Sequence, residues 1–134
     1  MSSSHNDTPT TILVIDPDLG FILALSKALL SEGYQVIPAS TMEEAATLTS
    51  ELELRIDAVV AEAGALASGG SDPMGGLGRW AARSAMIVAT STPEALAGKL
   101  PVRPAAVLRK PQANEPDLTE EWLRIIRQAL ALSR

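Results

Sequence analysis

The side chains in this sequence that could do chemistry are carboxylates, a hydroxyl and a lysine, each at the end of a short apolar run. They are Asp16, Asp18, Glu62, Thr90 and Lys110. Carboxylate oxygens are the ligands that a hard cation such as Mg²⁺ takes. This chemistry requires a fold that brings the five side chains to one place.

The composition excludes several other kinds of chemistry. The 134 residues include no Cys, so the chain has no thiolate nucleophile, Cys-ligated zinc or iron–sulfur cluster. The single histidine, His5, lies in a polar opening stretch, so we expect neither a Ser-His-Asp triad nor a histidine metal site in the fold. A net charge of −5 and only four aromatic residues argue against nucleic-acid binding.

Periodicity along the chain alternates between strand-like and helix-like segments. We expect strands at 11–15, 34–37, 57–62, 86–90 and 105–108. We expect helices from 19 to about 33, from 40 or 41 to about 54, around 77–83, at 93–97, and from 117 or 119 to the end. The stretch 64–78 holds six of the nine glycines and Pro73, which predicts a long loop.

Strands that alternate with helices predict a parallel sheet with helices on both faces. The length fits a single domain, which we place at residues 11–132 after a disordered tail at 1–10. In such sheets, ligands bind at the carboxyl ends of the strands. The five polar side chains all follow strands, so we expect them at that edge.

In order along the chain, four motifs resemble the receiver domain of bacterial two-component response regulators. They are Ile12-Leu13-Val14-Ile15-Asp16-Pro17-Asp18, Asp57-Ala58-Val59-Val60-Ala61-Glu62, Ile87-Val88-Ala89-Thr90-Ser91 and Lys110-Pro111. The resemblance covers residues 11–132 and implies a flavodoxin-like doubly wound sheet with strand order 2-1-3-4-5.

The resemblance also implies roles for individual residues. Asp16 and Asp18 would form the acidic pocket, and Glu62 stands at the phosphoacceptor position. Thr90 and Val107 stand at the two switch positions. Lys110 and Pro111 match a lysine followed by a cis-proline, so a trans bond there would count against the resemblance.

Three departures from the receiver pattern favour a pseudo-receiver. Pro17 replaces a ligand carboxylate, Glu62 replaces the phosphoacceptor aspartate, and Val107 replaces an aromatic residue. We therefore expect no bound cofactor; Asp16, Asp18 and Glu62 would be the ligands if Mg²⁺ bound. Our hypothesis is that Glu62 pairs with Lys110 and mimics the phosphorylated state.

The predicted function is that of a stand-alone signalling module rather than an enzyme. Without an output domain, it would act through contact with a histidine kinase or a downstream effector. One alternative is a working Mg²⁺-dependent phosphoacceptor. Another is a small nucleotide-binding protein, since 76–81 fits G-x-G-x-x-A, although no strand precedes that motif.

The first predicted helix carries a second apolar face in addition to its core stripe, which consists of Leu19, Ile22, Leu23, Leu29 and Leu30. Phe21, Leu25 and Ala28 recur at helical spacing, which predicts an interface with a partner or in a homodimer. No apolar run reaches the length of a membrane span, and the N-terminus does not resemble a signal peptide. We therefore expect a cytoplasmic protein that does not bind a membrane.

Overall fold

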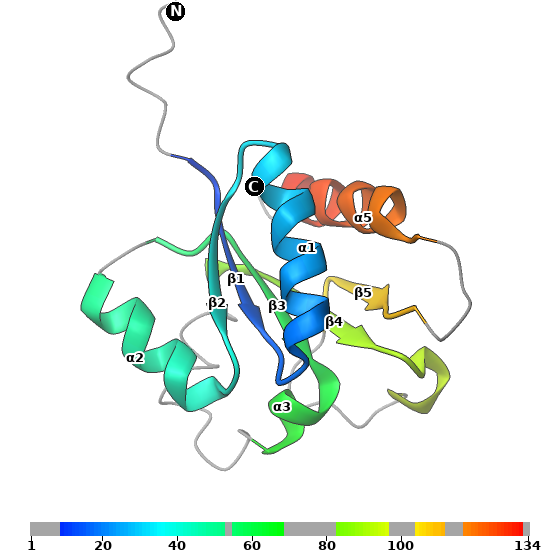
Figure 1. Ribbon diagram of the computed structural model, residues 1–134, viewed down its shortest axis with the longest axis horizontal. Helices are drawn as coiled ribbons and strands as arrows, with labels where there is room; N and C mark the ends of the chain where they lie inside the picture. Colours follow the sequence, from blue (N-terminus) through cyan, green and yellow to red (C-terminus); the bar gives the residue numbers. More distant parts are fainter. Residues whose placement is uncertain (1–8, 53–54, 69–82, 97–103, 112–116, 133–134) are drawn as a thin grey trace, which may run out of the picture.

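Five parallel strands form one sheet in the order β2-β1-β3-β4-β5 (Figure 1). The strands are β1 (Thr11–Ile15), β2 (Gln35–Ala39), β3 (Ala58–Glu62), β4 (Ala85–Thr90) and β5 (Ala106–Arg109). The structure is a computed structural model that describes residues 9–52, 55–68, 83–96, 104–111 and 117–132. The predicted strand order is confirmed.

Helices cover both faces of the sheet. Helices α1 (Leu19–Ser31) and α5 (Thr119–Leu132) lie together on one face, and α2 (Met42–Leu52) and α3 (Ala63–Ser68) pack against the other (Figure 1). A short 3₁₀ helix, η3 (Pro93–Leu96), follows β4. The chain therefore has the three-layer arrangement expected for a doubly wound sheet.

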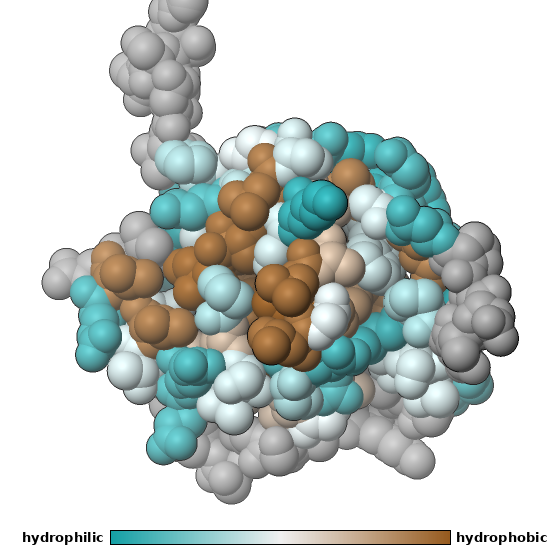
Figure 2. Space-filling view, viewed as in Figure 1, coloured by the Kyte–Doolittle hydropathy of each residue, from teal (hydrophilic) through white to brown (hydrophobic). Residues whose placement is uncertain are grey.

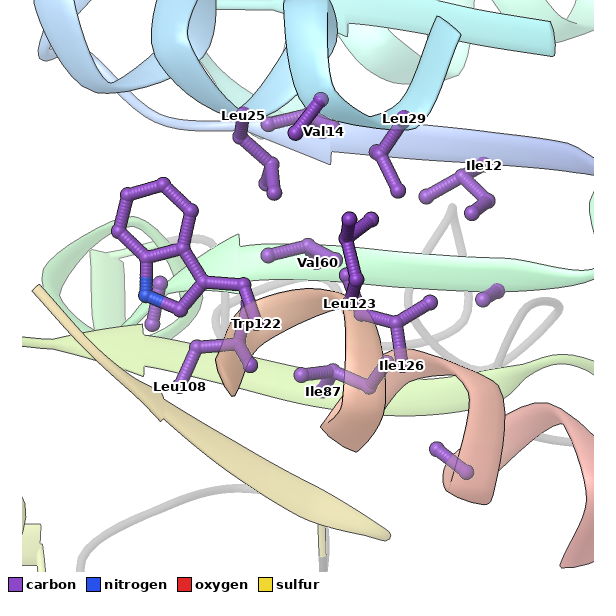
Figure 3. Close-up of a cluster of buried hydrophobic side chains, with 14 of the residues drawn as sticks. Ile12, Val14, Leu25, Leu29, Val60, Ile87, Leu108, Trp122, Leu123 and Ile126 are labelled. Carbon is purple, nitrogen blue, oxygen red and sulfur yellow. The ribbon is translucent and has the colours of Figure 1, made fainter. Parts of the chain in front are cut away.

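Each central strand contributes to two hydrophobic cores because successive side chains point to opposite faces. In β1, Ile12 and Val14 join the core beneath α1 and α5, and Leu13 and Ile15 join the core beneath α2 and α3. Figure 3 shows the first core, in which α1, α5 and the strands all contribute side chains. All five residues of β1 are buried, which agrees with its apolar run of four residues after Thr11.

Local sequence signals set several helix ends. The Oγ1 of Thr41 accepts a hydrogen bond from the amide of Glu44 and caps α2. Gly33, after α1, has a φ of 89°, a left-handed conformation that glycine adopts without strain. The carboxylate of Asp117 accepts a hydrogen bond from the amide of Thr119 at the start of α5.

The loop predicted at 64–78 is wrong in its first part, because 63–68 forms α3. The helix begins directly after β3, and Leu66 is fully buried in the core beneath it. Burial of Leu66 and the alanines of this short segment outweigh the glycine that suggested a loop. The described residues do not include the rest of that loop or the 76–81 motif. Of the helix predicted around 77–83, they include only Arg83.

The interface predicted on α1 is also wrong. Phe21, Leu25 and Ala28 are buried against the sheet and α5, because α1 packs on two neighbours rather than one. The exposed apolar side chains of α1 instead come from residues that the periodicity assigned to the core. They are Leu19, Leu23 and Leu30, and Figure 2 shows apolar surface over the outward side of this helix.

Within the part of the chain that the structure describes, no helix is long and apolar enough to cross a membrane.

Candidate functional site

The carboxyl edge of the sheet gathers the polar residues that the sequence singled out. Asp16 follows β1, Glu62 ends β3, Thr90 ends β4, and Lys110 follows β5. The strands are in register, with Ile15 beside Ala61, Glu62 beside Ala89 and Thr90 beside Arg109. Parallel pairing in this register therefore places the four side chains along one edge.

An ion pair between Asp16 and Lys110 forms the centre of the site. The Nζ of Lys110 lies 3.0 Å from Oδ2 and 3.3 Å from Oδ1 of Asp16. The Asp16 side chain is only 1% exposed and that of Lys110 is 16% exposed, so the pair is shielded from solvent. Asp16 Oδ1 also accepts a hydrogen bond from the amide of Asp18 at 2.8 Å, so both carboxylate oxygens have partners.

Asp18 caps α1 and also lies near the same lysine. Its Oδ1 accepts a hydrogen bond from the amide of Phe21 at 3.2 Å, as expected of an N-cap residue. Its Oδ2 lies 3.6 Å from the Nζ of Lys110. The sequence predicted an acidic pocket of Asp16 and Asp18, and the fold brings both carboxylates to one ammonium group.

The carboxylate of Glu62 turns toward helix α3. Its Oε1 accepts a hydrogen bond from the amide of Ala65 at 2.9 Å. A Cβ atom added at Gly64 would lie 3.0 Å from this oxygen, so a glycine there leaves room for the carboxylate. Because Lys110 lies on Asp16 and Asp18 instead, the predicted Glu62–Lys110 pair is wrong. Pairing with Lys110 stabilises the buried Asp16 carboxylate more than it would stabilise the half-exposed Glu62 carboxylate, because a buried charge without a partner is costly. Glu62 instead accepts a hydrogen bond from a backbone amide.

Two aromatic side chains hold Lys110 in place, and sequence reasoning gave neither of them this role. The Nζ of Lys110 lies 4.9 Å from the centroid of the Phe21 ring, within the range of a cation–π contact. The Trp122 ring packs edge-on against Phe21, with 5.2 Å between centroids. The Trp122 indole N–H donates to the backbone oxygen of Arg109, the residue before Lys110. The sequence offered one indication of the Phe21 contact, because Phe21 lies three residues after Asp18 and so in the first turn of the predicted helix.

The two switch positions lie on neighbouring strands. The Oγ1 of Thr90 accepts a hydrogen bond from the amide of Thr92 at 3.1 Å, and the Thr90 side chain is buried. Val107 is half-buried on β5, beside Val88 of β4. A hydroxyl that bonds the backbone two residues later stabilises the turn after β4.

The cis bond predicted at Lys110–Pro111 is wrong, because no peptide bond among the described residues is cis. The trans form is the favoured state of an X–Pro bond. With this bond trans, the Lys110 amide donates to the backbone oxygen of Thr90 at 2.8 Å, and its ammonium still reaches Asp16. This departure counts against the resemblance at that one position.

Burial raises the pKa of the Asp16 carboxyl above its ordinary value. The hydrogen bond from the Asp18 amide, the hydrogen bond from Lys110 and the charge of Lys110 all lower this pKa, and the nearby charge of Glu62 raises it. Desolvation is the largest effect. The ion pair therefore offsets only part of the cost of burying the Asp16 carboxylate.

The side chains present do not fit the Mg²⁺ site that the fold would imply. Pro17 offers no side-chain oxygen, and both oxygens of Asp16 already bind Lys110. Across the described ranges, no group of three or more His, Asp or Glu side chains is arranged to hold a metal ion. The arrangement holds a lysine ammonium between two carboxylates.

Comparison with solved structures identifies similar folds. The chemotaxis response regulator CheY4 of Vibrio cholerae has a TM-score of 0.68 at 20% identity, covering 91% of this chain and 99% of that chain. A chain of the CheX–CheY–BeF3–Mg complex from Borrelia burgdorferi has a TM-score of 0.66 at 17% identity, covering 93% and 92%. HP1043, an orphan response regulator of H. pylori, has a TM-score of 0.67 at 15% identity, covering 90% and 96%.

No protein-family model matches the chain, and no curated protein matches it. The chain therefore has the fold of response regulator receiver domains, as the motifs predicted. At these sequence identities the likeness establishes the fold alone.

Proposed function

We propose that this chain is a receiver-like signalling domain of a two-component system that acts by binding another protein and does not use phosphoryl transfer. The observation that carries this proposal is the closed state of the carboxylates at the carboxyl edge of the sheet. Asp16 and Asp18 contact Lys110, and Glu62 bonds the amide of Ala65. Each of the three carboxylates therefore already has a partner within the protein, and Lys110 is paired with carboxylates and not left to bind a phosphoryl group.

The residue types at two positions support the same conclusion. Phosphoryl transfer to a receiver needs a metal-bound carboxylate nucleophile and a cation that neutralises the phosphoryl oxygens. Pro17 cannot contribute a carboxylate, and Lys110 is already neutralised by Asp16. Glu62, one methylene longer than aspartate, is used as the cap of α3.

The proposed partner is a histidine kinase or a downstream effector, since proteins with this fold include response regulators and a chain of a CheX–CheY complex. Signalling by contact alone needs a surface held in one conformation. The Lys110–Asp16 pair and the Phe21–Trp122 contact tie α1 and α5 to the end of the sheet. This fixed arrangement supports a module whose binding surface does not depend on a modification.

Mass spectrometry of the intact protein after incubation with acetyl phosphate and Mg²⁺ tests the proposal. We expect no phosphoryl adduct on the wild type or on Glu62→Ala. The matched positive control is the double variant Pro17→Asp with Glu62→Asp, which restores both carboxylates of the receiver pattern and should gain an adduct. A stoichiometric adduct on the wild type that is absent from Glu62→Ala would establish the alternative, a working phosphoacceptor.

A further inference from the structure

We propose that helix α1 carries a self-association surface, through which two copies of this chain pair with their α1 helices antiparallel. The surface is the leucine ridge, defined as Leu19, Leu23 and Leu30. The inference goes beyond the proposed function and does not depend on it, because it concerns how copies of the chain meet and not how the carboxyl edge of the sheet is occupied.

The leucine ridge runs along the side of α1 that faces away from the core. Its three side chains are 67%, 64% and 59% exposed, whereas Leu25 and Leu29 of the same helix are fully buried. Residues four or seven positions apart lie on one side of a helix, so the three leucines form a single strip. From residue 19 to residue 30 the strip is about 16 Å long. Figure 2 shows apolar surface over this side of the helix.

Other exposed leucines of the described chain are isolated. Of the large apolar side chains that the structure describes, only Leu52 and Leu132 are also highly exposed, and they are the last residues of α2 and α5. Single exposed leucines are common on proteins, but a contiguous strip marks a surface that binds another molecule. The leucine ridge is therefore the strongest candidate for an interface on the described surface.

The spacing along the ridge is that of a seam between two helices. Positions 19, 23, 26 and 30 are separated by four, three and four residues, as are the side chains that meet along a helix–helix contact. In an antiparallel, twofold-related pair, Leu19 of one copy lies opposite Leu30 of the second copy. Leu23 then lies opposite Ser26 of the second copy, which is small and half-buried. Each copy thus offers a recess for a leucine of the other, and the ridge is complementary to itself.

The charges beside the ridge also fit a second copy. Lys27 is exposed one helical turn after Leu23 and forms no ion pair with another described residue. Asp18, at the N-cap of α1, has a side chain that is 55% exposed. In the antiparallel pair, Asp18 of the second copy lies level with Ser31, one turn beyond Lys27. Each Lys27 ammonium can therefore reach a carboxylate of the other copy, and the twofold axis makes this contact twice.

A lipid surface fits these charges less well than a second copy does. Helices that lie on membranes carry several Lys or Arg residues beside their apolar strip, which attract anionic lipids. Lys27 is the only basic residue of α1, and its charge is offset by that of Asp18.

The size of the ridge indicates a weak dimer. A stable interface buries about 800 Å² from each partner, which is more than three partly exposed leucines and their neighbours supply. We therefore expect a dissociation constant of the order of 100 µM. The chain would be monomeric when dilute and paired at high local concentration.

Sedimentation equilibrium of the whole chain from about 10 µM to 1 mM tests the proposal. We expect the average mass of the wild type to rise with concentration from the monomer value of 14.1 kDa toward twice that value. The double variant Leu19→Gln with Leu23→Gln should associate at least about tenfold more weakly, because it removes most of the apolar strip. Leu52→Gln removes an exposed leucine from α2 and, as the matched control, should pair like the wild type. Circular dichroism checks that the variants fold.

The absence of Cys from the chain allows a test of the orientation. Ser31→Cys, carrying a nitroxide spin label at natural isotope abundance, is mixed with the ¹⁵N-labelled wild type. An antiparallel pair predicts broadening between copies at the amides of Leu19 and Gly20, which follow Asp18. The same label on Glu51→Cys, at an exposed position of α2, should leave these amides unchanged.

Three results would overturn the inference. One is a wild type that stays monomeric up to about 1 mM. Another is association that persists in Leu19→Gln with Leu23→Gln, or broadening centred on Ser31 or on another element, because the contact would then differ from the proposed one. The third is flotation of the monomer with phosphatidylglycerol vesicles that the double variant abolishes, which would assign the ridge to lipid. None of these results concerns phosphoryl transfer, so the inference and the proposed function can fail separately.

Discussion

The Nζ atom of Lys110 lies 3.0 Å from Oδ2 of Asp16, which joins the end of edge strand β5 to the end of β1 across β3 and β4. The chain separation between the two residues is 94 positions, so only the folded sheet brings them together. Their contact closes the site at the carboxyl edge of the sheet. It is also the most direct target for measurements of stability.

Lys110→Met should lower the free energy of unfolding at pH 7 by about 3 kcal/mol, because it leaves the buried Asp16 carboxylate without its cation. Urea denaturation followed by circular dichroism measures the change. Lys27→Met, on the exposed side of α1, should change stability by less than about 0.5 kcal/mol. Equal effects of the two substitutions would show that the Lys110–Asp16 pair contributes nothing specific.

The pH dependence of stability should carry the signature of Asp16. Burial raises its pKa in the folded protein above the ordinary value, so the folded state binds more protons at this group than the unfolded chain does. The contribution of Asp16 to stability is therefore fully present below the unfolded pKa and is lost as pH rises through the folded pKa. The charged groups that act on it are Lys110 and Glu62.

Asp16→Asn should remove that downward slope, which is measured from denaturation curves at successive pH values above about 4. Asp117→Asn is a control of opposite sign. Hydrogen bonds from Thr119 lower the pKa of Asp117, so its contribution is present above the unfolded pKa and is lost as pH falls through the folded pKa. Identical slopes for the wild type and Asp16→Asn would contradict the assignment of a raised pKa to Asp16.

Trp122→Phe should cost about 1–2 kcal/mol, because it removes the indole donor to the Arg109 oxygen but keeps a ring against Phe21. Trp122→Ala should cost about 3–5 kcal/mol, because it also opens a cavity in the core. Leu23→Ala, at an exposed position of α1, should be nearly neutral. The prediction fails if Trp122→Phe is as destabilising as Trp122→Ala.

Gly64 and Glu62 should be energetically coupled. Alanine is favoured over glycine in a helix by up to about 1 kcal/mol, yet a Cβ atom at position 64 would lie 3.0 Å from Oε1 of Glu62. Gly64→Ala should therefore stabilise the Glu62→Ala variant more than it stabilises the wild type. A double-mutant cycle measures the difference, expected at about 0.5–1 kcal/mol, and additive effects would contradict it.

Much of the fold could be predicted from local patterns. Continuous apolar runs predict the strands, and the sequence predicts the start of α2 at 40 or 41 and the end of α1 at about 33, where the structure has the cap residue Thr41 and Gly33. The faces of α1 were harder to predict. Leu19 and Leu23 are spaced as a core stripe, yet Phe21 and Leu25 are the ones buried. Apolar residues on all sides of a helix cannot show which side its neighbours will cover.

The site was predicted as a set of positions and not as a set of contacts. The ends of the strands correctly placed Asp16, Glu62, Thr90 and Lys110 along one edge. Lys110 pairs with Asp16 and not with Glu62 because Asp16 is buried and because α3 provides a backbone donor for Glu62. Neither the burial of Asp16 nor this hydrogen bond could be predicted from the sequence.

The sequence by itself determined the alternation of strands and helices that makes a parallel sheet, and the kinds of groups at its carboxyl edge, including the absence of a side-chain oxygen at Pro17. These features follow from periodicity and residue type, which act over a few neighbouring positions. The strand order was implied by the resemblance to receiver domains. Only the tertiary structure decided that Lys110 binds Asp16 and lies over the Phe21 ring, against which Trp122 packs. That choice is a competition between desolvation and pairing among residues far apart in the chain, and it is settled where they pack together.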